Sequence, residues 1–491
     1  MNNNVVKKLV VVGGGTAGRF AAAALANQLK PEYYEITVIE SSHIGATSVG
    51  ESLVPPVAAF IRDLGVDEQE FIAQTGAGYK LGIQFCNWLE KDSSFFHPFG
   101  RLGRALNGHD FFQCWLKARA EGDRTPLSDY SPAAVLARAR KFTLPAKLPL
   151  DSPLTGLDYA FHLDSKDMNL YFREYAERRN VKHIQAHVVR VNKAENGNIQ
   201  SLELNNRQTV EGDFFIDCTG TRGMLIGEAL DSPLESWSDL LPCDRAVTVQ
   251  SDLFGPVDPY STYTAREYGW SWKIPLKNRC SVGYVFSSRF CSDDEAARVL
   301  LDSVETDPAS EPTLISIRQG ARKEQWKKNC IAIGLSSGFL EPLESSSIYL
   351  ATRGINQLLA LFPNLHRGEQ DWPGLAAQFN TRMLMEYEEI RDFITLHYFT
   401  TQRSDTEFWR LCQSLPVPDA LAARLELFRE RGELEMLENG LFKASSWQAL
   451  FTGMNIFPGS YHPFMDLSDF KEIHQAMQSD QQGIRDAADA V

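Results

Sequence analysis

The sequence lacks the features that mark several classes of protein. No unbroken apolar stretch in it approaches the roughly 20 residues of a membrane-spanning helix, so we expect no membrane partner. Its eight cysteines form no C-x-x-C pair or zinc-ligand spacing, which favours reduced thiols and a cytoplasmic location. Its ten histidines show no H-E-x-x-H or 2-His-1-carboxylate pattern, so no metal site is predicted. The net charge of -14 argues against a nucleic-acid partner.

What the sequence does contain is typical of a globular enzyme. Its 491 residues are 43% hydrophobic and 23% charged, and this length suits two or three structural units. Strand-like and helix-like segments alternate up to about residue 363. After that the pattern is helical, with helices predicted over residues 375–398, 407–413 and 420–439.

The N-terminal segment predicts a dinucleotide site. An apolar run over residues 5–12 is typical of a buried parallel strand, and the turn that follows reads G-x-G-x-x-G before a run of helix formers. Gly13 permits a tight turn, Gly15 lets the backbone approach a pyrophosphate, and Gly18 lets the helix pack close to the strand. Thr16 and Ala17 open the helix, whose N-terminus faces the phosphates.

Glu40 supplies the acid that such a site needs. It ends a second strand over residues 35–40, roughly 20 residues past the glycines, where a carboxylate accepts a hydrogen bond from a ribose hydroxyl. Because a carboxylate disfavours a 2′-phosphate, FAD or NAD is favoured over NADP. The alternative is a glycine-rich turn that holds no cofactor.

Two later strands also end in small, polar turns. Asp217 closes a buried strand over 213–217, as in two-dinucleotide-fold flavoproteins, where such a strand returns beside the adenosine part of FAD. The strand that ends at Gly334 runs into small residues and then a helix, an arrangement whose free backbone amides suit an anion. Glu341 and Glu344 lie there; in the alternative reading, one caps the helix and the other is solvated.

Lys80 and a tryptophan pair are the remaining candidates. Lys80 lies among small and apolar residues, an expensive setting for a charge, which indicates a functional amine; the alternative is a lysine that extends to water. Trp270 and Trp272 point to one face of a strand and form a bulky wall, or else a core pair.

Taken together, these motifs resemble the flavin-dependent tryptophan halogenase family. The resemblance is carried by Trp-Ser-Trp-Lys-Ile-Pro at 270–275, the turn at 13–18, Lys80 and Glu-Pro-Leu-Glu-Ser at 341–345. Supporting segments lie at 50–55, 95–100, 217–220 and 447–463. The resemblance implies an α/β fold with a box-like FAD-binding domain, of the two-dinucleotide type with a Rossmann βαβ unit, and a mainly helical, pyramid-like substrate domain. We expect the first at 1–85 and 150–362 and the second at 86–149 and 363–491.

The resemblance also implies a mechanism. A separate NAD(P)H-dependent flavin reductase delivers reduced FAD, oxygen converts it to a flavin hydroperoxide, and chloride or bromide attacks to give hypohalous acid. Lys80 then holds the oxidant beside the aromatic substrate, and Glu344 matches the partner carboxylate. Ser346 and Ser347 match the halide site, and Glu51 falls among the cofactor-binding residues.

The substrate-binding residues depart from the tryptophan-specific pattern. His97 and Phe99 match the aromatic walls, and further site-shaping residues are Trp270, Trp272, Ile274, Pro275, Trp447 and Phe457. The adjacent tyrosines that clamp the ends of free tryptophan are replaced by Ser-Ser-Trp-Gln at 445–448. We therefore expect indole or a derivative to be favoured over tryptophan. Ser346 and Ser347 replace the Thr-Gly that is common in the family, so the choice between chloride and bromide stays open.

Two other functions stay open at this point. A flavin-dependent monooxygenase would hydroxylate an aromatic substrate with the same hydroperoxide, and a non-catalytic flavin-binding protein would retain the fold alone. Lys80 and the tryptophan pair argue against the first, and Lys80 and Glu344 argue against the second. A homodimer also stays open.

Overall fold

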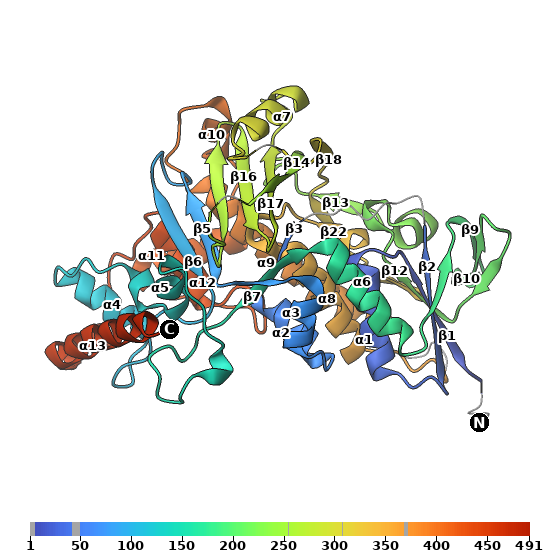
Figure 1. Cartoon of the computed structure of the whole chain (residues 1–491), viewed down its shortest axis with the longest axis horizontal. Coiled ribbons are helices and arrows are strands. Elements are labelled where there is room, and N and C mark those ends of the chain that lie inside the picture. Colours follow the sequence, from blue (N-terminus) through green and yellow to red (C-terminus); the bar gives the residue numbers. More distant parts are fainter. Residues whose placement is uncertain (1–4, 42–49, 254, 307, 368–371) are drawn as a thin grey trace. The chain divides into compact units, whose positions relative to one another are not determined.

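The computed structural model describes residues 5–41, 50–253, 255–306, 308–367 and 372–491 (Figure 1). The chain divides into two compact units, each assembled from three segments. The first comprises Met1–Ala77, Leu163–Ser238 and Ile317–Glu388, and the second comprises Gly78–His162, Asp239–Ser316 and Glu389–Val491.

A six-stranded sheet forms the centre of the first unit, in the order β20-β21-β12-β1-β2-β8. All neighbours are parallel except β20 and β21. The strands are β1 (Lys7–Val12), β2 (Tyr34–Glu40), β8 (Lys182–Gln185), β12 (Phe214–Asp217), β20 (Trp326–Lys327) and β21 (Cys330–Ala332). Because both faces are covered, β1 is apolar throughout its last four residues, which are all buried. The predicted Rossmann unit is confirmed by this parallel sheet.

Helices and two small sheets complete the first unit. The helices are α1 (Thr16–Gln28), α2 (Pro55–Asp63), α3 (Glu68–Thr75), α6 (Ser165–Glu177), α8 (Ser346–Ala360) and the first part of α9 (Trp372–Phe399). One antiparallel sheet joins β9 (Val188–Lys193), β10 (Ile199–Leu204) and β11 (Thr209–Glu211), and another joins β13 (Leu234–Ser236), β19 (Gly320–Arg322) and β22 (Gly338–Phe339). The short strand β3 (Gly50–Ser52) also lies in this unit.

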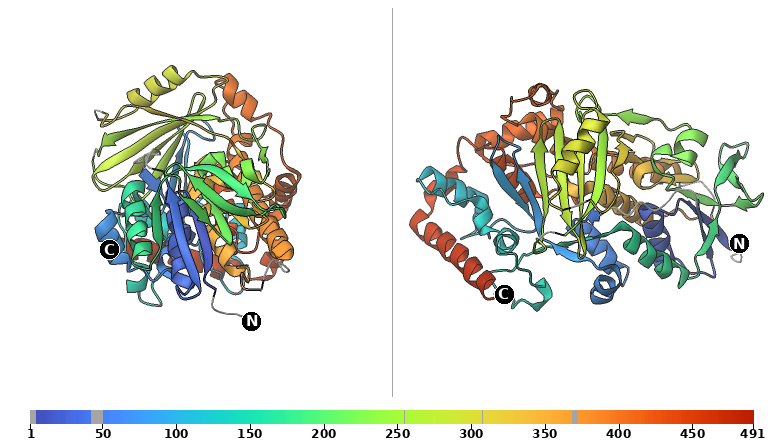
Figure 2. Two further views of the ribbon diagram at one scale, coloured as in Figure 1. Left: turned by 90° about the vertical axis from the view of Figure 1, so that its right-hand side faces the viewer. Right: turned by 45° about the horizontal axis from the view of Figure 1, so that its top comes forward.

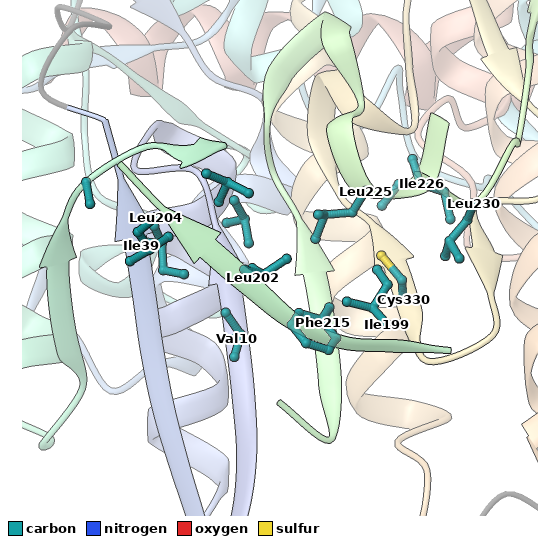
Figure 3. Close-up of a cluster of buried hydrophobic side chains, with 14 residues drawn as sticks. Val10, Ile39, Ile199, Leu202, Leu204, Phe215, Leu225, Ile226, Leu230 and Cys330 are labelled. Carbon is teal, nitrogen blue, oxygen red and sulfur yellow. The ribbon is translucent and has the colours of Figure 1, made fainter. Parts of the chain in front are cut away.

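One apolar cluster joins β10 to the parallel sheet (Figure 3). Val10 of β1 and Phe215 of β12 stand in register, and Leu202 of β10 packs with them, none more than 1% exposed. Burying a side chain of this size contributes about 1.5–3 kcal/mol, so the cluster holds β1 and β12 firmly. The carboxyl ends of these two strands carry the predicted cofactor residues.

The second unit is built on a seven-stranded sheet, in the order β18-β14-β17-β16-β15-β5-β6. Its strands are β5 (Gly82–Cys86), β6 (Ser94–Pro98), β14 (Arg245–Asp252), β15 (Ser261–Arg266), β16 (Gly269–Pro275), β17 (Arg279–Phe286) and β18 (Thr313–Ser316). Helix α7 (Asp293–Asp302) crosses one face of this sheet (Figure 2). Its Ala296 and Leu300 pack on β14 and β17. Beside this sheet, β4 (Gly78–Lys80) pairs antiparallel with β7 (Ala160–Asp164).

This unit also contains several further helices. They are α4 (Phe111–Ala120), α5 (Pro132–Arg138), α10 (Glu407–Cys412), α11 (Asp419–Arg431), α12 (Ala444–Gly453) and α13 (Phe470–Asp489), together with the last part of α9. The predicted helix at 420–439 is thus too long, because Gly432 adopts φ 75° and ends α11 at Arg431. No helix in the described ranges is long and apolar enough to cross a membrane.

Candidate active site

The three glycines of the dinucleotide turn meet different surroundings. Gly13 has φ +121°, and a Cβ there would lie within 3.0 Å of the carbonyl oxygen of Cys218. A Cβ on Gly18 would clash in the same way with the carbonyl oxygen of Gly13. A Cβ on Gly15, in contrast, would meet no atom within 4 Å in the part of the chain that the structure describes. The fold itself therefore requires Gly13 and Gly18, whereas the space before Gly15, at the N-terminus of α1, is open to a pyrophosphate.

The side chain of Glu40 packs against Gly14 of this turn. A Cβ on Gly14 would collide with its carboxylate, and Arg19 donates from its guanidinium to the same carboxylate. Arg173 stands 3.6 Å from the other oxygen, Oε1. Burial lowers the pKa of Arg19, although Glu40 opposes that shift. Arg19 thus fixes the predicted ribose acceptor. Sequence reasoning missed Arg19, because its contact with Glu40 depends on how α1 packs beside β2.

Asp217 is fully buried, and both of its oxygens are already engaged. Oδ1 accepts from the backbone N–H and the hydroxyl of Thr219, at 2.9 and 2.6 Å, and Oδ2 accepts from the N–H groups of Leu225 and Ile226, both at 2.8 Å. The carboxylate therefore organises the turn after β12. That turn places Cys218 against Gly13, so Asp217 shapes the cofactor site from behind it.

The carboxyl of Glu51, in β3, is a weaker acid than an ordinary glutamate. Burial, and then the negative charge of Asp164, raise the pKa of its carboxyl to about 7. A carboxyl poised near neutral pH is a candidate for function, because such shifts gather at sites that handle charge.

The start of α8 is a strained turn. Glu344 and Ser345 adopt φ 68° and 59°, in the left-handed region that non-glycine residues rarely occupy. Ser346 and Ser347 then open the helix, and their hydroxyl oxygens are buried with no hydrogen-bond partner in the part of the chain that the structure describes. Strain of this kind gathers at functional sites, and free N–H groups at a helix N-terminus suit an anion.

The two glutamates of this segment have separate environments. Glu341 is fully buried, accepts from the side-chain amide of Gln319 at 2.7 Å, and has a backbone N–H that donates to Gln319 Oε1 at 2.8 Å. Glu344 is only 2% exposed, so the reading in which one of the two is solvated is wrong.

Gly334 has φ 73°, and a Cβ there would lie 2.7 Å from that of Ala17 in α1. The structure thus brings Gly334 to the glycine turn, as a cofactor site requires.

Lys80 is completely buried in the second unit, so the reading in which it extends to water is wrong. Its ammonium lies 4.9 Å from the centroid of the Phe99 ring, a cation–π contact. The chain passes from Lys80 directly into β5, and the N–H of Phe99 donates to the carbonyl of Leu81 at 2.8 Å. The predicted amine and one predicted aromatic wall are therefore neighbours.

A second set of aromatic side chains surrounds Phe393 of α9. The ring of His97 lies 5.8 Å from Phe393, Trp447 meets it edge-on at 4.8 Å, and Phe442 stacks on it at 3.7 Å. His97 and Trp447 are thus brought together through Phe393 and Phe442. Sequence reasoning missed both phenylalanines, because no local pattern sets them apart from other core residues of these helical segments.

Phe457 lies with other partners. It stacks on Trp115 at 6.3 Å, and the Arg119 guanidinium lies 3.9 Å from its ring centroid. Phe457 and Arg119, with Arg124, line a surface cavity of about 580 Å³. Its assignment as a substrate wall stays a prediction.

Trp270 and Trp272 share one face of β16, with ring centroids 6.1 Å apart. Their exposures are 0% and 7%, and Ile274 and Pro275 are buried beyond them. Gly283 of β17 stands opposite Trp272, whose indole occupies the place of the missing side chain.

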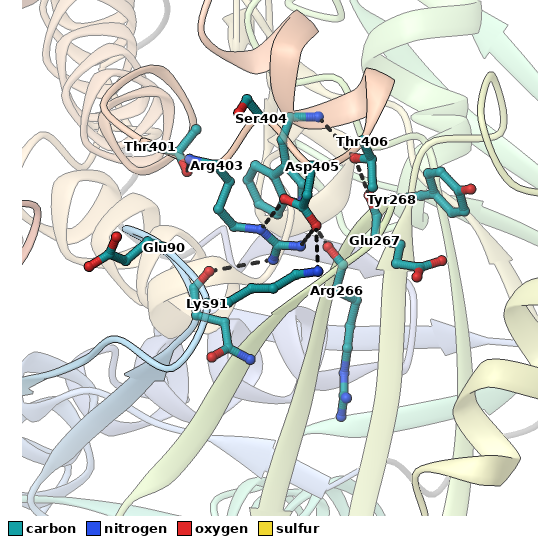
Figure 4. Close-up of polar contacts among 12 residues, drawn as sticks. Glu90, Lys91, Arg266, Glu267, Tyr268, Thr401, Arg403, Ser404, Asp405 and Thr406 are labelled. Atoms are coloured by element: carbon teal, nitrogen blue, oxygen red, sulfur yellow. Dashed lines mark hydrogen bonds and ion pairs between the residues drawn. The ribbon is translucent and has the colours of Figure 1, made fainter.

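Polar contacts anchor the hairpin that leads to Trp270 (Figure 4). Trp409 donates to the carbonyl of Arg266 at 2.7 Å, and the Thr406 hydroxyl donates to that of Glu267 at 2.8 Å. Arg403 binds Asp405 through two hydrogen bonds of 3.0 and 2.9 Å and lies over Trp409. The start of β16 is therefore rigidly held.

Comparison with known proteins agrees with this arrangement. The structure is similar to BrvH, a flavin-dependent halogenase from Brevundimonas sp. BAL3, with a TM-score of 0.92, 40% identity and coverage of 99% of this chain and 97% of the other. Xcc4156, a flavin-dependent halogenase from Xanthomonas campestris, gives a TM-score of 0.93 at 38% identity, covering 99% and 96%. The tryptophan 6-halogenase SttH from Streptomyces toxytricini is 35% identical over 451 residues, which cover 87% of this chain and 85% of that protein.

These likenesses define a class, the flavin-dependent halogenases, whose fold this chain shares. The tryptophan halogenase profile matches residues 8–469, and the chain belongs to that family. It is therefore an enzyme that uses reduced FAD, oxygen and a halide. The open space before Gly15 and the carboxylate of Glu40 fit the pyrophosphate and ribose of FAD.

Proposed function

We propose that this enzyme installs chloride or bromide on indole or an indole derivative in preference to free tryptophan. A separate NAD(P)H-dependent flavin reductase would supply the reduced FAD. When bound, reduced FAD would give two electrons to oxygen, and the two-electron oxidant so formed would take two electrons from the halide to give hypohalous acid. In this proposal the glycine turn, Glu40 and Glu51 of the first unit hold FAD, and the aromatic side chains of the second unit hold the substrate.

The single observation that carries the proposal is the burial of Lys80 against Phe99. Taking an ammonium out of water is costly, which favours a functional role for Lys80, and here it lies over the face of a ring that the substrate would contact. Its N–H donors can hold the oxygen of hypohalous acid and increase the electrophilic character of the halogen. Lys80 therefore acts as the relay between oxidant and substrate.

Glu344 and the start of α8 supply the acid–base and anion functions. The strained turn fixes the Glu344 carboxylate, which can accept the proton released when the ring regains aromaticity. Halide binds at the α8 N-terminus through N–H groups. The hydroxyls of Ser346 and Ser347, which have no hydrogen-bond partner among the residues described, add two donors.

The preference for indole rests on what surrounds His97 and Trp447. Phe393 and Phe442 make the surroundings of these two side chains apolar and aromatic. Ser445 at the start of α12 already donates to the carbonyl of Gly100 at 3.2 Å. Nothing in segment 445–448 carries the charge that would clamp a carboxylate or ammonium group, so a free amino acid would lose those contacts. SttH, by its name, acts on tryptophan.

Replacing Lys80 with alanine tests this proposal. We expect Lys80→Ala to lose halogenated product by mass spectrometry while FAD affinity and peroxide release stay at wild-type levels. Lys273→Met is the matched control, because Lys273 is a half-exposed lysine of β16 that pairs with Glu305, and it should leave product formation unchanged. If Lys80→Ala still halogenates the substrate, the lysine takes no part in the reaction. A product one oxygen heavier would instead identify a monooxygenase.

A further inference from the structure

His162 of β7 lies on the same sheet face as Lys80. In the antiparallel pairing of β4 and β7, His162 stands opposite Gly78, and Lys80 stands opposite Ala160. Side chains of directly opposed residues project to one face, as do those two residues apart, so Lys80 and His162 are diagonal neighbours, about 7–8 Å apart at their backbones. Both are buried, with exposures of 0% and 1%.

Gly78 leaves open space on that face. A Cβ added to Gly78 would point toward the same side as Lys80 and His162, and it would meet no atom of the described residues within 4 Å. The missing side chain therefore leaves room for a small molecule beside them.

The imidazole of His162 has one committed nitrogen and one unused nitrogen. Nε2 is hydrogen-bonded to the Ser261 hydroxyl at 2.9 Å, which fixes the ring. Nδ1 is buried and has no hydrogen-bond partner among the described residues. Burial, and then the positive charge of Lys80, lower the pKa of His162, so that the ring is neutral at physiological pH. A neutral ring adds no second positive charge beside the lysine.

We propose that His162 Nδ1 and Lys80 together bind hypohalous acid in the space over Gly78, which makes His162 a second contact of the oxidant. The inference rests on the proposed function, since it assumes that Lys80 holds the oxidant. Hypohalous acid is small and neutral, and it both donates through its O–H and accepts at oxygen. It therefore suits Nδ1 in either tautomer, whether Nδ1 carries the proton or a lone pair. Lys80 donates to the oxygen in both cases.

The test compares the fate of the oxidant in variants of His162. Reactions contain the enzyme, FAD, a flavin reductase, bromide and indole, with a β-diketone added to trap escaped hypohalous acid. One neutral hydrogen bond contributes about 1 kcal/mol, so we expect His162→Leu to raise the ratio of trapped halogen to halogenated indole about fivefold, with total halide oxidation unchanged. His162→Gln, which keeps a neutral polar group, should restore part of the wild-type ratio.

Phe161→Leu is the matched control, because Phe161 is a buried neighbour on β7 that projects to the opposite face. It should lower stability and leave the ratio unchanged. An unchanged ratio in His162→Leu would overturn the inference, as would an equal rise in Phe161→Leu. If His162→Leu does not fold, Ser261→Ala takes its place with a smaller rise expected, and no rise there overturns the inference. Failure of the proposed function would appear separately, as no halogenated indole from the wild-type enzyme.

Discussion

Replacing Gly15 with alanine separates what the fold needs from what the cofactor needs. Gly15 has φ -78° and ψ -175°, which alanine adopts without strain, and a Cβ there would meet no atom of residues 5–41, 50–253, 255–306, 308–367 or 372–491 within 4 Å. Alanine also reduces the conformational entropy of the unfolded chain. The free energy of unfolding of the FAD-free protein should therefore stay equal or rise by about 0.4–1 kcal/mol.

FAD affinity should change in the opposite direction to the free energy of unfolding. The added methyl group would occupy the space through which the backbone approaches the pyrophosphate, at the N-terminus of α1. We expect FAD affinity to fall by at least about tenfold, which corresponds to about 1.4 kcal/mol. Isothermal titration calorimetry gives the affinity, and urea unfolding of the FAD-free protein gives the stability.

Gly13→Ala is the matched comparison within the same turn. Its Cβ would meet the carbonyl oxygen of Cys218, whose N–H is held by the carbonyl of Val12 at 2.8 Å, and its φ of +121° is strained for alanine. We expect this variant to lose about 3 kcal/mol or more of stability. Wild-type FAD affinity in Gly15→Ala, or a loss of stability equal to that of Gly13→Ala, would refute the assignment of this space to the cofactor.

Three further predictions follow from buried polar groups. Asp217→Asn turns an amide N–H toward backbone N–H groups that donate to the carboxylate in the wild type, so the free energy of unfolding should fall by about 2 kcal/mol. A loss below about 0.5 kcal/mol would exclude the role of Asp217 in organising the turn. Because the pKa of Glu51 is raised from 4.5 to about 7, folding favours its protonated form, and this contribution to stability is lost as pH rises through that window. Glu51→Gln should therefore flatten the pH dependence of Tm between pH 4.5 and 7, and an unchanged slope would contradict the assignment. Changing Ser346 and Ser347 together to alanine should leave Tm unchanged, since their hydroxyls bond no described residue, and should raise the halide KM a fewfold; an unchanged KM would leave halide binding to backbone amides alone.

Local patterns account for the parts of the site that sequence could predict. The turn at 13–18 and the placement of Trp270 and Trp272 on one face depend on residues close in sequence, and the structure has both. The early end of α11 was also readable, because Gly432 follows its last turn. Composition likewise marked Lys80 as an unusual lysine, and its burial agrees with that.

Contacts between distant segments account for the rest. The Glu341–Gln319 bonds assign a structural role to one glutamate of a pair that sequence could not separate. His162 becomes a neighbour of Lys80 only through the register of β4 and β7, and Arg19 reaches Glu40 only when α1 packs beside β2. A pattern read along the chain carries no register, so these partners appear only in the folded structure.

Mass spectrometry of the reconstituted reaction tests the central claim most directly. The enzyme would be given FAD, a flavin reductase with NADH, bromide or chloride, and an equimolar mixture of indole and tryptophan. The account predicts the halogen isotope pattern on indole in excess over tryptophan. Halogenated tryptophan in excess would contradict the proposed substrate preference, and no halogen on either compound, with oxygen added instead, would contradict the proposed reaction.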